Sequence, residues 1–219
     1  MIGSASSESP SPGTRRAPGA VRERLLDVAS ELFYRRGFHA VGVDTVIAES
    51  GVAKMTLYKY FPSKDDLIVA VLRRRQAQFR AWFAAALARR ASASGATESG
   101  GIASGAAPNA GVERVLAVFD VLGEWFALPT FRGCAFTNAV LELTDPAHGV
   151  HEVNRAHREW LVATLAALVR DAGITAFDDV AAQLVTLIDG AIVQAASTQN
   201  IAAAQVARRA ATAVLAAAR

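Results

Sequence analysis

The stretch VDTVIAESGVAKMTLYKYFPSK, residues 43–64, holds two short helical patterns separated by Gly51. The first helix is expected over 44–50 and the second over 54–61, where an apolar pair four residues apart lies on one face. Gly51 suits the position just after a helix end, because glycine adopts a left-handed conformation at little cost. Two short helices across a tight, glycine-containing turn are typical of a helix-turn-helix.

The outward residues of the second helix have the chemistry of a DNA-reading surface. They supply two cations, a hydroxyl, two aromatic donors and one flexible apolar side chain, which suit phosphate anchoring and contacts to base edges and thymine methyls in a major groove. The alternative is a solvated face between two helices of a bundle, but the turn glycine and the interleaved tyrosines favour DNA binding. These candidates are Lys54, Met55, Thr56, Tyr58, Lys59 and Tyr60.

Residues 21–74 resemble the DNA-binding domain of the TetR (tetracycline-repressor-like) family of bacterial regulators. The matching motifs are LLDVASELFYRRGF at 25–38, IAESGVAK at 47–54 and TLYKYFPSKDDL at 56–67. The resemblance implies an all-α protein with an N-terminal three-helix, helix-turn-helix DNA-binding domain and a C-terminal helical ligand-binding and dimerisation domain. It also implies a sequence-specific transcriptional regulator, most often a repressor, that a small-molecule ligand releases from a palindromic operator.

The family pattern adds two candidate DNA contacts and shows two departures. Lys64 resembles the family's phosphate-contacting lysine. The family commonly begins its second helix with Thr or Ser, where this chain has Gly42 and Val43, so a phosphate contact there falls to backbone N–H groups or to Thr45. The family often has Gly where this chain has Met55, which either reaches a thymine methyl or packs on a neighbouring tyrosine.

Composition and charge are consistent with that resemblance. The chain has 219 residues and 52% hydrophobic residues, many of them the helix-former alanine, without alternating β-branched runs. Residues 1–90 hold 15 Lys and Arg against 8 Asp and Glu, a net charge of +7, whereas residues 91–219 hold 8 against 12, a net charge of −4. A basic end on an acidic body is typical of a protein that presents that end to nucleic acid. A membrane surface would attract the same charge, but it requires a basic amphipathic helix with exposed apolar bulk.

The sequence also predicts a bacterial cytoplasmic protein. Its one cysteine, Cys134, fits a reducing compartment. No apolar leader stands near the N-terminus, and no charge-free stretch is apolar enough over the length of a bilayer.

Three segments are expected along the chain. Residues 1–19, rich in Ser, Pro and Gly, form a disordered arm whose Arg15 and Arg16 either enter a minor groove or are incidental. Residues 20–80 form the DNA-binding domain, with the helix-turn-helix at about 43–62, and residues 81–219 form the C-terminal domain. Within them, the first helix is expected over 21–36 and the fourth from 64 to about 90, opened by a capping box of Ser63 with Asp66, and a flexible loop over 91–110.

Five helices are expected after that loop: 112–128, 131–143, one opened by Asp145–Pro146 and running to about 172, one from about 175 to 198, and 201–218. The last two, about 176–198 and 201–218, resemble the family's dimerisation pair. Burial of their apolar face inside one subunit is the alternative. A homodimer would double the reading helix and place two half-sites ~34 Å apart or a multiple of that distance.

The C-terminal domain resembles the family's ligand-binding domain, in which helices enclose a cavity. Aromatic residues with a few polar groups suit a ligand site, although each aromatic taken singly is more often an ordinary core residue. The candidate lining residues are Trp82, Phe83, Phe119, Trp125, Phe126, Phe136, Asn138 and Trp160.

The sequence predicts no catalytic, cofactor or metal site. His148, His151 and His157 do not make an H-E-x-x-H zinc pattern, and Cys134 lacks the surroundings of a nucleophile. Besides the regulator, the sequence leaves one competing function: a helical ligand-binding or scaffold protein whose basic end binds nucleic acid only nonspecifically.

Overall fold

The computed structural model describes residues 18–97 and 110–219, and within these ranges the chain is built of helices and turns without a strand. The all-α prediction is therefore confirmed. The helices are α1 (Pro18–Arg36), α2 (Val43–Ser50), α3 (Lys54–Tyr60), α4 (Lys64–Thr97), α5 (Ala110–Phe126), α6 (Ala135–Glu142), α7 (Gly149–Asp171), α8 (Phe177–Thr198) and α9 (Ala203–Ala217).

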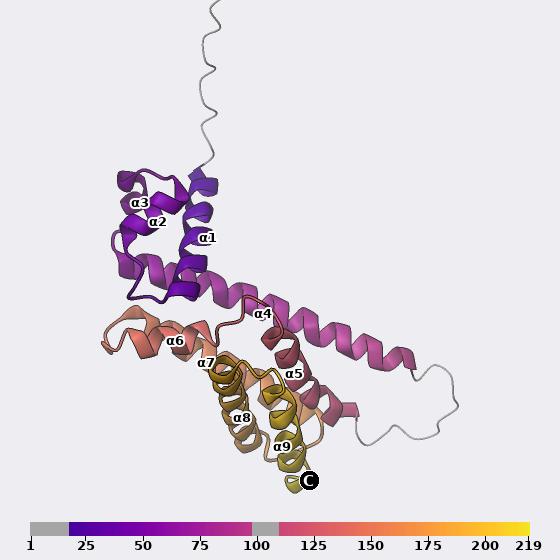
Figure 1. Ribbon diagram of the computed structural model, residues 1–219. Coiled ribbons are helices and arrows are strands. Elements are labelled where there is room, and N and C mark those ends of the chain that lie inside the picture. Colours follow the sequence, from indigo (N-terminus) through magenta and orange to yellow (C-terminus); the bar gives the residue numbers. More distant parts are fainter. Residues whose placement is uncertain (1–17, 98–109) are drawn as a thin grey trace, which may run out of the picture.

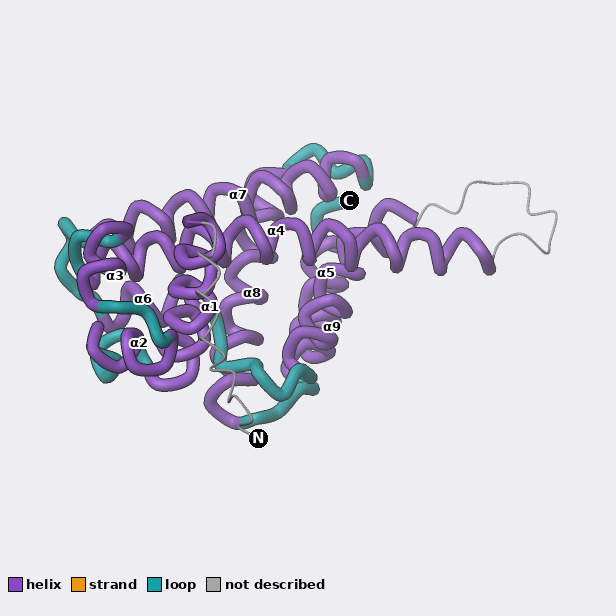
Figure 2. The backbone as a smooth tube through the Cα atoms, turned by 90° about the horizontal axis from the view of Figure 1, so that it is seen from above, coloured by secondary structure: helices purple, strands orange, loops and turns teal. Residues whose placement is uncertain are grey.

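The helices form a small head and a larger body. Helices α1–α3 with the first turns of α4 make the head, and the long α4 runs from under the head along the body (Figure 1). Helix α6 lies beneath the head, and α5, α7, α8 and α9 complete the body (Figures 1 and 2). A single helix thus joins the two parts, and the expected domain boundary at residue 80 falls inside it.

The head has its own hydrophobic core, which continues into the body. Leu25, Leu57 and Leu67, from three of its helices, are fully buried. Phe136 of α6 and Val153 of α7 belong to the same apolar cluster. The head therefore completes its core with side chains that follow it in the sequence by more than sixty residues.

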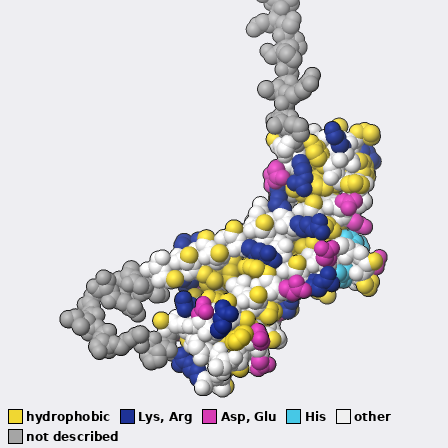
Figure 3. Space-filling view, turned by 180° about the vertical axis from the view of Figure 1, so that it is seen from behind, with side chains coloured by type: hydrophobic (Ala, Val, Ile, Leu, Met, Phe, Trp, Pro, Cys, Tyr) yellow, Lys and Arg dark blue, Asp and Glu magenta, His cyan; other side chains and the backbone are white. Residues whose placement is uncertain are grey.

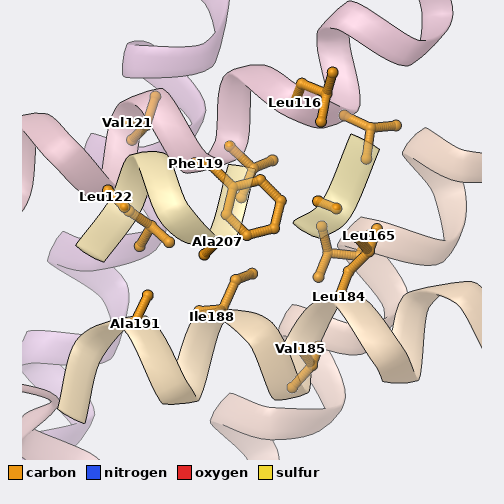
Figure 4. Close-up of a cluster of buried hydrophobic side chains, with 14 of the residues drawn as sticks. Leu116, Phe119, Val121, Leu122, Leu165, Leu184, Val185, Ile188, Ala191 and Ala207 are labelled. Atoms are coloured by element: carbon orange, nitrogen blue, oxygen red, sulfur yellow. The ribbon is translucent and has the colours of Figure 1, made fainter. Parts of the chain in front are cut away.

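The body core lies where α5, α7, α8 and α9 meet. Phe119 of α5 stands at its centre, pointing toward Ile188 of α8 and Ala207 of α9 (Figure 4). Apolar residues on α8 recur at helical spacing and are buried here. For Leu184, Ile188 and their neighbours, the structure therefore shows burial inside one subunit, which was the alternative to a dimer face.

Hydrogen bonds also fasten the head to α6 and to the turn before it. The Glu142 carboxylate accepts from the backbone N–H groups of Phe38 and His39, at 2.7 and 3.1 Å. The Tyr34 hydroxyl donates to the carbonyl of Gly133 and accepts from the N–H of Arg132, both at 2.8 Å. The Glu142 carboxylate and the backbone of the turn before α6 thus hold the C-terminal end of α1 and the turn after it.

Two expected boundaries around α6 and α7 are wrong. Helix α6 begins at Ala135 and not at residue 131, because Gly133 has φ of 86° and the turn before it is held by Tyr34. Helix α7 begins at Gly149 and not at Pro146, because the Asp145 carboxylate accepts from the N–H of Ala147 and closes a turn. The helix cap is instead His148, whose Nδ1 accepts from the N–H of Val150.

Helix α4 continues to Thr97, past the expected end near residue 90 and into the expected loop. Its alanines propagate a helix that is already formed, which costs far less than starting one. The opening of α4 matches the expectation: the Ser63 hydroxyl accepts from the N–H of Asp66 at 3.0 Å and donates to its carboxylate at 2.7 Å.

The remaining ends differ by two or three residues. Helix α1 begins at Pro18 and not at residue 21, and α5 covers Ala110–Phe126 in place of 112–128, ending before Pro129. Helix α8 begins at Phe177, and α9 begins at Ala203 after a turn in which Asn200 accepts from the N–H of Ala202. Residues 1–17 of the expected arm, with Arg15 and Arg16, and residues 98–109 of the expected loop lie outside the described residues.

Helix α8 differs from the expectation that no segment is apolar enough to span a bilayer. Among the described helices it alone passes that test, by length and composition, with a mean hydropathy of 1.4. Most of its large apolar residues are buried in the body core, and this packing accounts for much of its composition, although Val193 is exposed.

Candidate nucleic-acid interface and internal cavity

The helix-turn-helix has the geometry that the sequence predicts. Gly51 closes α2 with φ of 63°, and its N–H donates to the carbonyl of Ile47 at 3.0 Å. Helix α3 then packs through Leu57, which has no exposed surface, and Phe61 caps it. Only one face of α3 is thus held by the head, and no part of the chain that the structure describes covers the opposite face.

That free face carries the predicted reading residues. Met55 is 83% exposed and Tyr58 is 40% exposed, which is unusual for large apolar and aromatic side chains. Lys59 is exposed, and Thr56 and Tyr60 are half-buried at the edges of the face. All five lie on the seven-residue α3, so their side chains are presented together.

The other three predicted contacts lie around α3. The ammonium group of Lys54 is 3.0 Å from a carboxylate oxygen of Asp44, and this hydrogen bond, followed by the carboxylate's charge, raises the pKa of Lys54. Thr45 is half-buried in the first turn of α2. Lys64, at the start of α4, lies near the turn after α1, where its ammonium group is 3.4 Å from the carbonyl of His39.

The molecular surface is not uniformly basic. Figure 3 shows Lys and Arg side chains on the head and along the body, with Asp and Glu side chains among them. Cationic character at the interface therefore depends on a few residues of the head.

A cavity lies in the body, between α4, α5, α6, α7 and α8. Its volume is about 60 Å³, and it is partly open to solvent. Four aromatic rings form much of its wall: Phe79, Phe83, Trp125 and Phe136. Three of them, all but Phe79, are among the eight residues expected to line a ligand site.

The structure places the other five expected residues outside the cavity wall. Phe119 and Phe126 are buried in the body core. Trp82 and Trp160 pack as half-buried rings around Phe79, and the Asn138 amide donates to the carbonyl of Arg132.

The polar part of the cavity wall was not among the eight residues expected to line a ligand site. It contains Arg75, Thr137, His157, Arg158 and Asp189. Arg158 and Asp189 form a close ion pair, with a 2.7 Å bond from the guanidinium to Oδ1. The available signal was the four-residue spacing that puts Arg75, Phe79 and Phe83 on one face of α4.

The comparisons with known proteins agree with this geometry. A family model described as "Bacterial regulatory proteins, tetR family" matches residues 25–71. Across nearly the whole chain, the structure resembles that of a TetR-family transcriptional regulator from Streptomyces coelicolor, with 34% identity, coverage of 91% of this chain and 96% of that one, and a TM-score of 0.75. The chain belongs to the TetR family.

Two further relatives extend the comparison. A TetR transcriptional regulator from Chloroflexus aurantiacus shares the fold at 21% identity, with a TM-score of 0.72 over 91% of this chain and 96% of that one. The transcriptional activator FasR of Mycolicibacterium smegmatis is 44% identical over 69 residues, which are 30% of this chain and 32% of FasR. The match therefore spans about a third of that relative's length.

Membership in the TetR family confirms the predicted class of function. The protein is a DNA-binding transcriptional regulator with a helix-turn-helix, in a family whose members bind operator DNA as dimers and respond to ligands. This TetR-family chain is also expected to show a pH dependence of stability that originates in the cavity.

His157 is the source of that pH dependence. It is only 6% exposed, and burial, followed by the charges of Arg80 and Arg158, lowers its pKa from 6.5 to about 4. Between those two pH values the unfolded chain binds a proton that the folded chain does not, so the free energy of unfolding falls as the pH falls. The loss approaches about 3 kcal/mol at pH 4 from this group alone.

Urea unfolding of the wild type and of His157→Phe between pH 7 and pH 4 checks this expectation. The phenylalanine keeps a ring at the position of the imidazole, whose centroid lies 4.0 Å from that of Phe136. The variant should lose less stability than the wild type below pH 6.5. Parallel pH profiles for the two proteins would show that His157 is not the titrating group.

Proposed function

We propose that the free face of α3 reads the operator in a major groove, with Tyr58 and Met55 at base edges and methyls. Support comes from their exposure, which no packing against the described residues explains. Thr56, Lys59 and Tyr60 flank that contact, whereas Thr45, Lys54 and Lys64 anchor phosphates. Lys54 would exchange its partner Asp44 for a phosphate.

We also propose that two copies pair through α8 and α9. From Ala182 to Thr198 the exposed residues of α8 are uncharged and mostly small, and Val193, Ile201 and Val206 are exposed apolar residues of this region. These residues leave a surface on which a second copy can approach closely. Two heads on a symmetric body would then meet two half-sites of a palindrome.

The proposed protein is a repressor of the bacterial cytoplasm that leaves its operator when the cavity binds a small molecule. Helix α4 supports this coupling, because it forms part of both the head and the cavity wall. A ligand that prefers one tilt of α4 shifts the population of head spacings, and only that difference in affinity can release DNA. In this proposal residues 20–80 form the DNA-binding domain and residues 81–219 the ligand-binding and dimerisation domain.

The competing function is a helical ligand-binding or scaffold protein with only nonspecific affinity for nucleic acid. A salt series separates the two. Both would lose affinity steeply as salt increases, because both release counterions. Only an operator-binding regulator keeps a large ratio of specific to nonspecific affinity at each salt concentration.

Tyr58→Ala is expected to reduce that ratio by tenfold or more, because one base contact contributes about 1–3 kcal/mol of discrimination. Fluorescence anisotropy with operator and scrambled duplexes measures it. Lys64→Ala is the matched comparison: it should weaken both duplexes by a similar factor and reduce the salt slope by about one. A Tyr58→Ala protein with undiminished preference for the operator would contradict direct readout by this face.

A further inference from the structure

Arg75 stands in the wall between the cavity and the head. It lines the cavity one helical turn before Phe79, and its guanidinium carbon lies 3.8 Å from the centroid of the Tyr34 ring in α1. Its neighbours Arg73 and Arg74 each pair with a carboxylate, at 3.7 and 2.8 Å. Within residues 18–97 and 110–219, no such ion pair involves Arg75, which is half-buried.

The other charges of the cavity cancel. Arg158 and Asp189 neutralise each other through their ion pair, and His157 is uncharged at neutral pH. Arg75 therefore leaves the cavity with one unbalanced positive charge. In a partly buried site that charge is weakly screened, and a guanidinium there binds a carboxylate through two parallel hydrogen bonds more strongly than it binds a ring face.

Apart from Thr137, the remaining described residues of the wall are largely apolar, and His157 adds one polar atom without a partner. Phe79, Phe83, Trp125 and Ile188 are among the apolar residues that line the space. His157, 94% buried, has an Nδ1 for which the described part of the chain provides no hydrogen-bond partner. Such a site suits a molecule with an apolar body and few polar groups.

We propose that the cavity binds an apolar molecule carrying one anionic group of the carboxylate class, and that Arg75 binds that group. This inference rests on the ligand control in the proposed function and assigns the chemical class of the ligand. An apolar cation is disfavoured, because the carboxylate of Asp189 is already occupied by Arg158.

Arg75 also connects the cavity to the head, so an anion bound to it can affect the head. Tyr34, on which Arg75 stacks, holds the turn at Arg132 and Gly133 through its hydroxyl. Burial raises the pKa of Tyr34, so its phenol stays protonated and can donate to the carbonyl of Gly133. An anion that turns the guanidinium toward the cavity weakens the stack and with it one attachment between α1 and the body.

Isothermal titration calorimetry on the full chain without DNA tests the ligand class. The probes are decanoate, 1-decanol and decyltrimethylammonium, each below its aggregating concentration, because they share one apolar chain and differ in charge. Decanoate is expected to bind at least about tenfold more tightly than the alcohol, and the cation more weakly than both. Equal binding of acid and alcohol, tighter binding of the cation, or binding of none of the three would overturn the proposal.

Two variants assign the charge to its residue. Arg75→Gln is expected to lower decanoate affinity by about tenfold and to leave decanol affinity unchanged, which also shows that the variant is folded. Arg73→Gln, an exposed neighbour outside the cavity wall, should behave as the wild type with both probes. Unchanged decanoate affinity in Arg75→Gln would place the anion elsewhere and refute the assignment.

Operator release is measured separately, by anisotropy of a labelled duplex during a decanoate titration. If decanoate binds through Arg75 while the operator stays bound, the ligand class holds and the proposed ligand control fails. If decanoate releases the operator equally from wild type and Arg75→Gln, ligand control holds and the role of Arg75 is refuted. Release by the wild type alone supports both.

Discussion

Val193→Arg is expected to turn the protein into a monomer and to lower its operator affinity by about 100-fold or more. Val193 is 60% exposed on the outward face of α8, and an arginine there would set two like charges against each other across a two-fold axis. Linked heads gain about 10²–10⁴ in affinity because the second half-site is bound intramolecularly, and a monomer loses that gain.

Sedimentation velocity and operator anisotropy on the same preparation check this result. Ala84→Arg is the control, because it adds the same charge at an exposed position of α4, away from the α8 and α9 pair. It should stay dimeric and bind the operator normally. A Val193→Arg protein that sediments as a dimer would show that the subunits pair through another surface.

Leu57→Ala is expected to lower the free energy of unfolding of the head by about 2–5 kcal/mol, as deletion of a fully buried leucine does. Leu57 has no exposed surface and is the residue by which α3 is anchored. Loss of that anchor leaves the reading helix without a fixed position. Operator binding should therefore be lost.

Met55→Ala, two residues earlier on the same helix, is the matched variant. Met55 is 83% exposed, so its loss should change stability by no more than about 0.5 kcal/mol. It should reduce operator preference while thermal unfolding, followed by circular dichroism, stays that of the wild type. If Met55→Ala destabilises as much as Leu57→Ala, the face assigned to DNA is instead a packing face.

Local chemistry explains why the head could be predicted so closely from the sequence. A glycine after an amphipathic turn predicts a left-handed residue, and Gly51 adopts one. A serine three residues before an aspartate predicts a helix start, and Ser63 provides it. Each of these features depends on residues within a few positions of one another, which a pattern in the sequence can show.

The body was less predictable because its decisive contacts are distant in sequence. Tyr34 shortens α6 by holding Gly133, 99 residues away, and no local pattern announces that bond. The cavity wall depends on how five helices pack, so aromatic character alone could not separate Trp125, which lines it, from Phe119, which fills the core. The ion pair of Arg158 with Asp189 joins two helices and is likewise invisible in either one.

The sharing of the head's core with α6 and α7 bears on how such regulators can be recombined. A chimaera cut within α4 would transplant the head without Phe136 and Val153, on which its apolar cluster depends. It would also lose the Glu142 carboxylate that receives two N–H groups at the end of α1. A graft that preserves operator recognition must therefore carry these later segments with it.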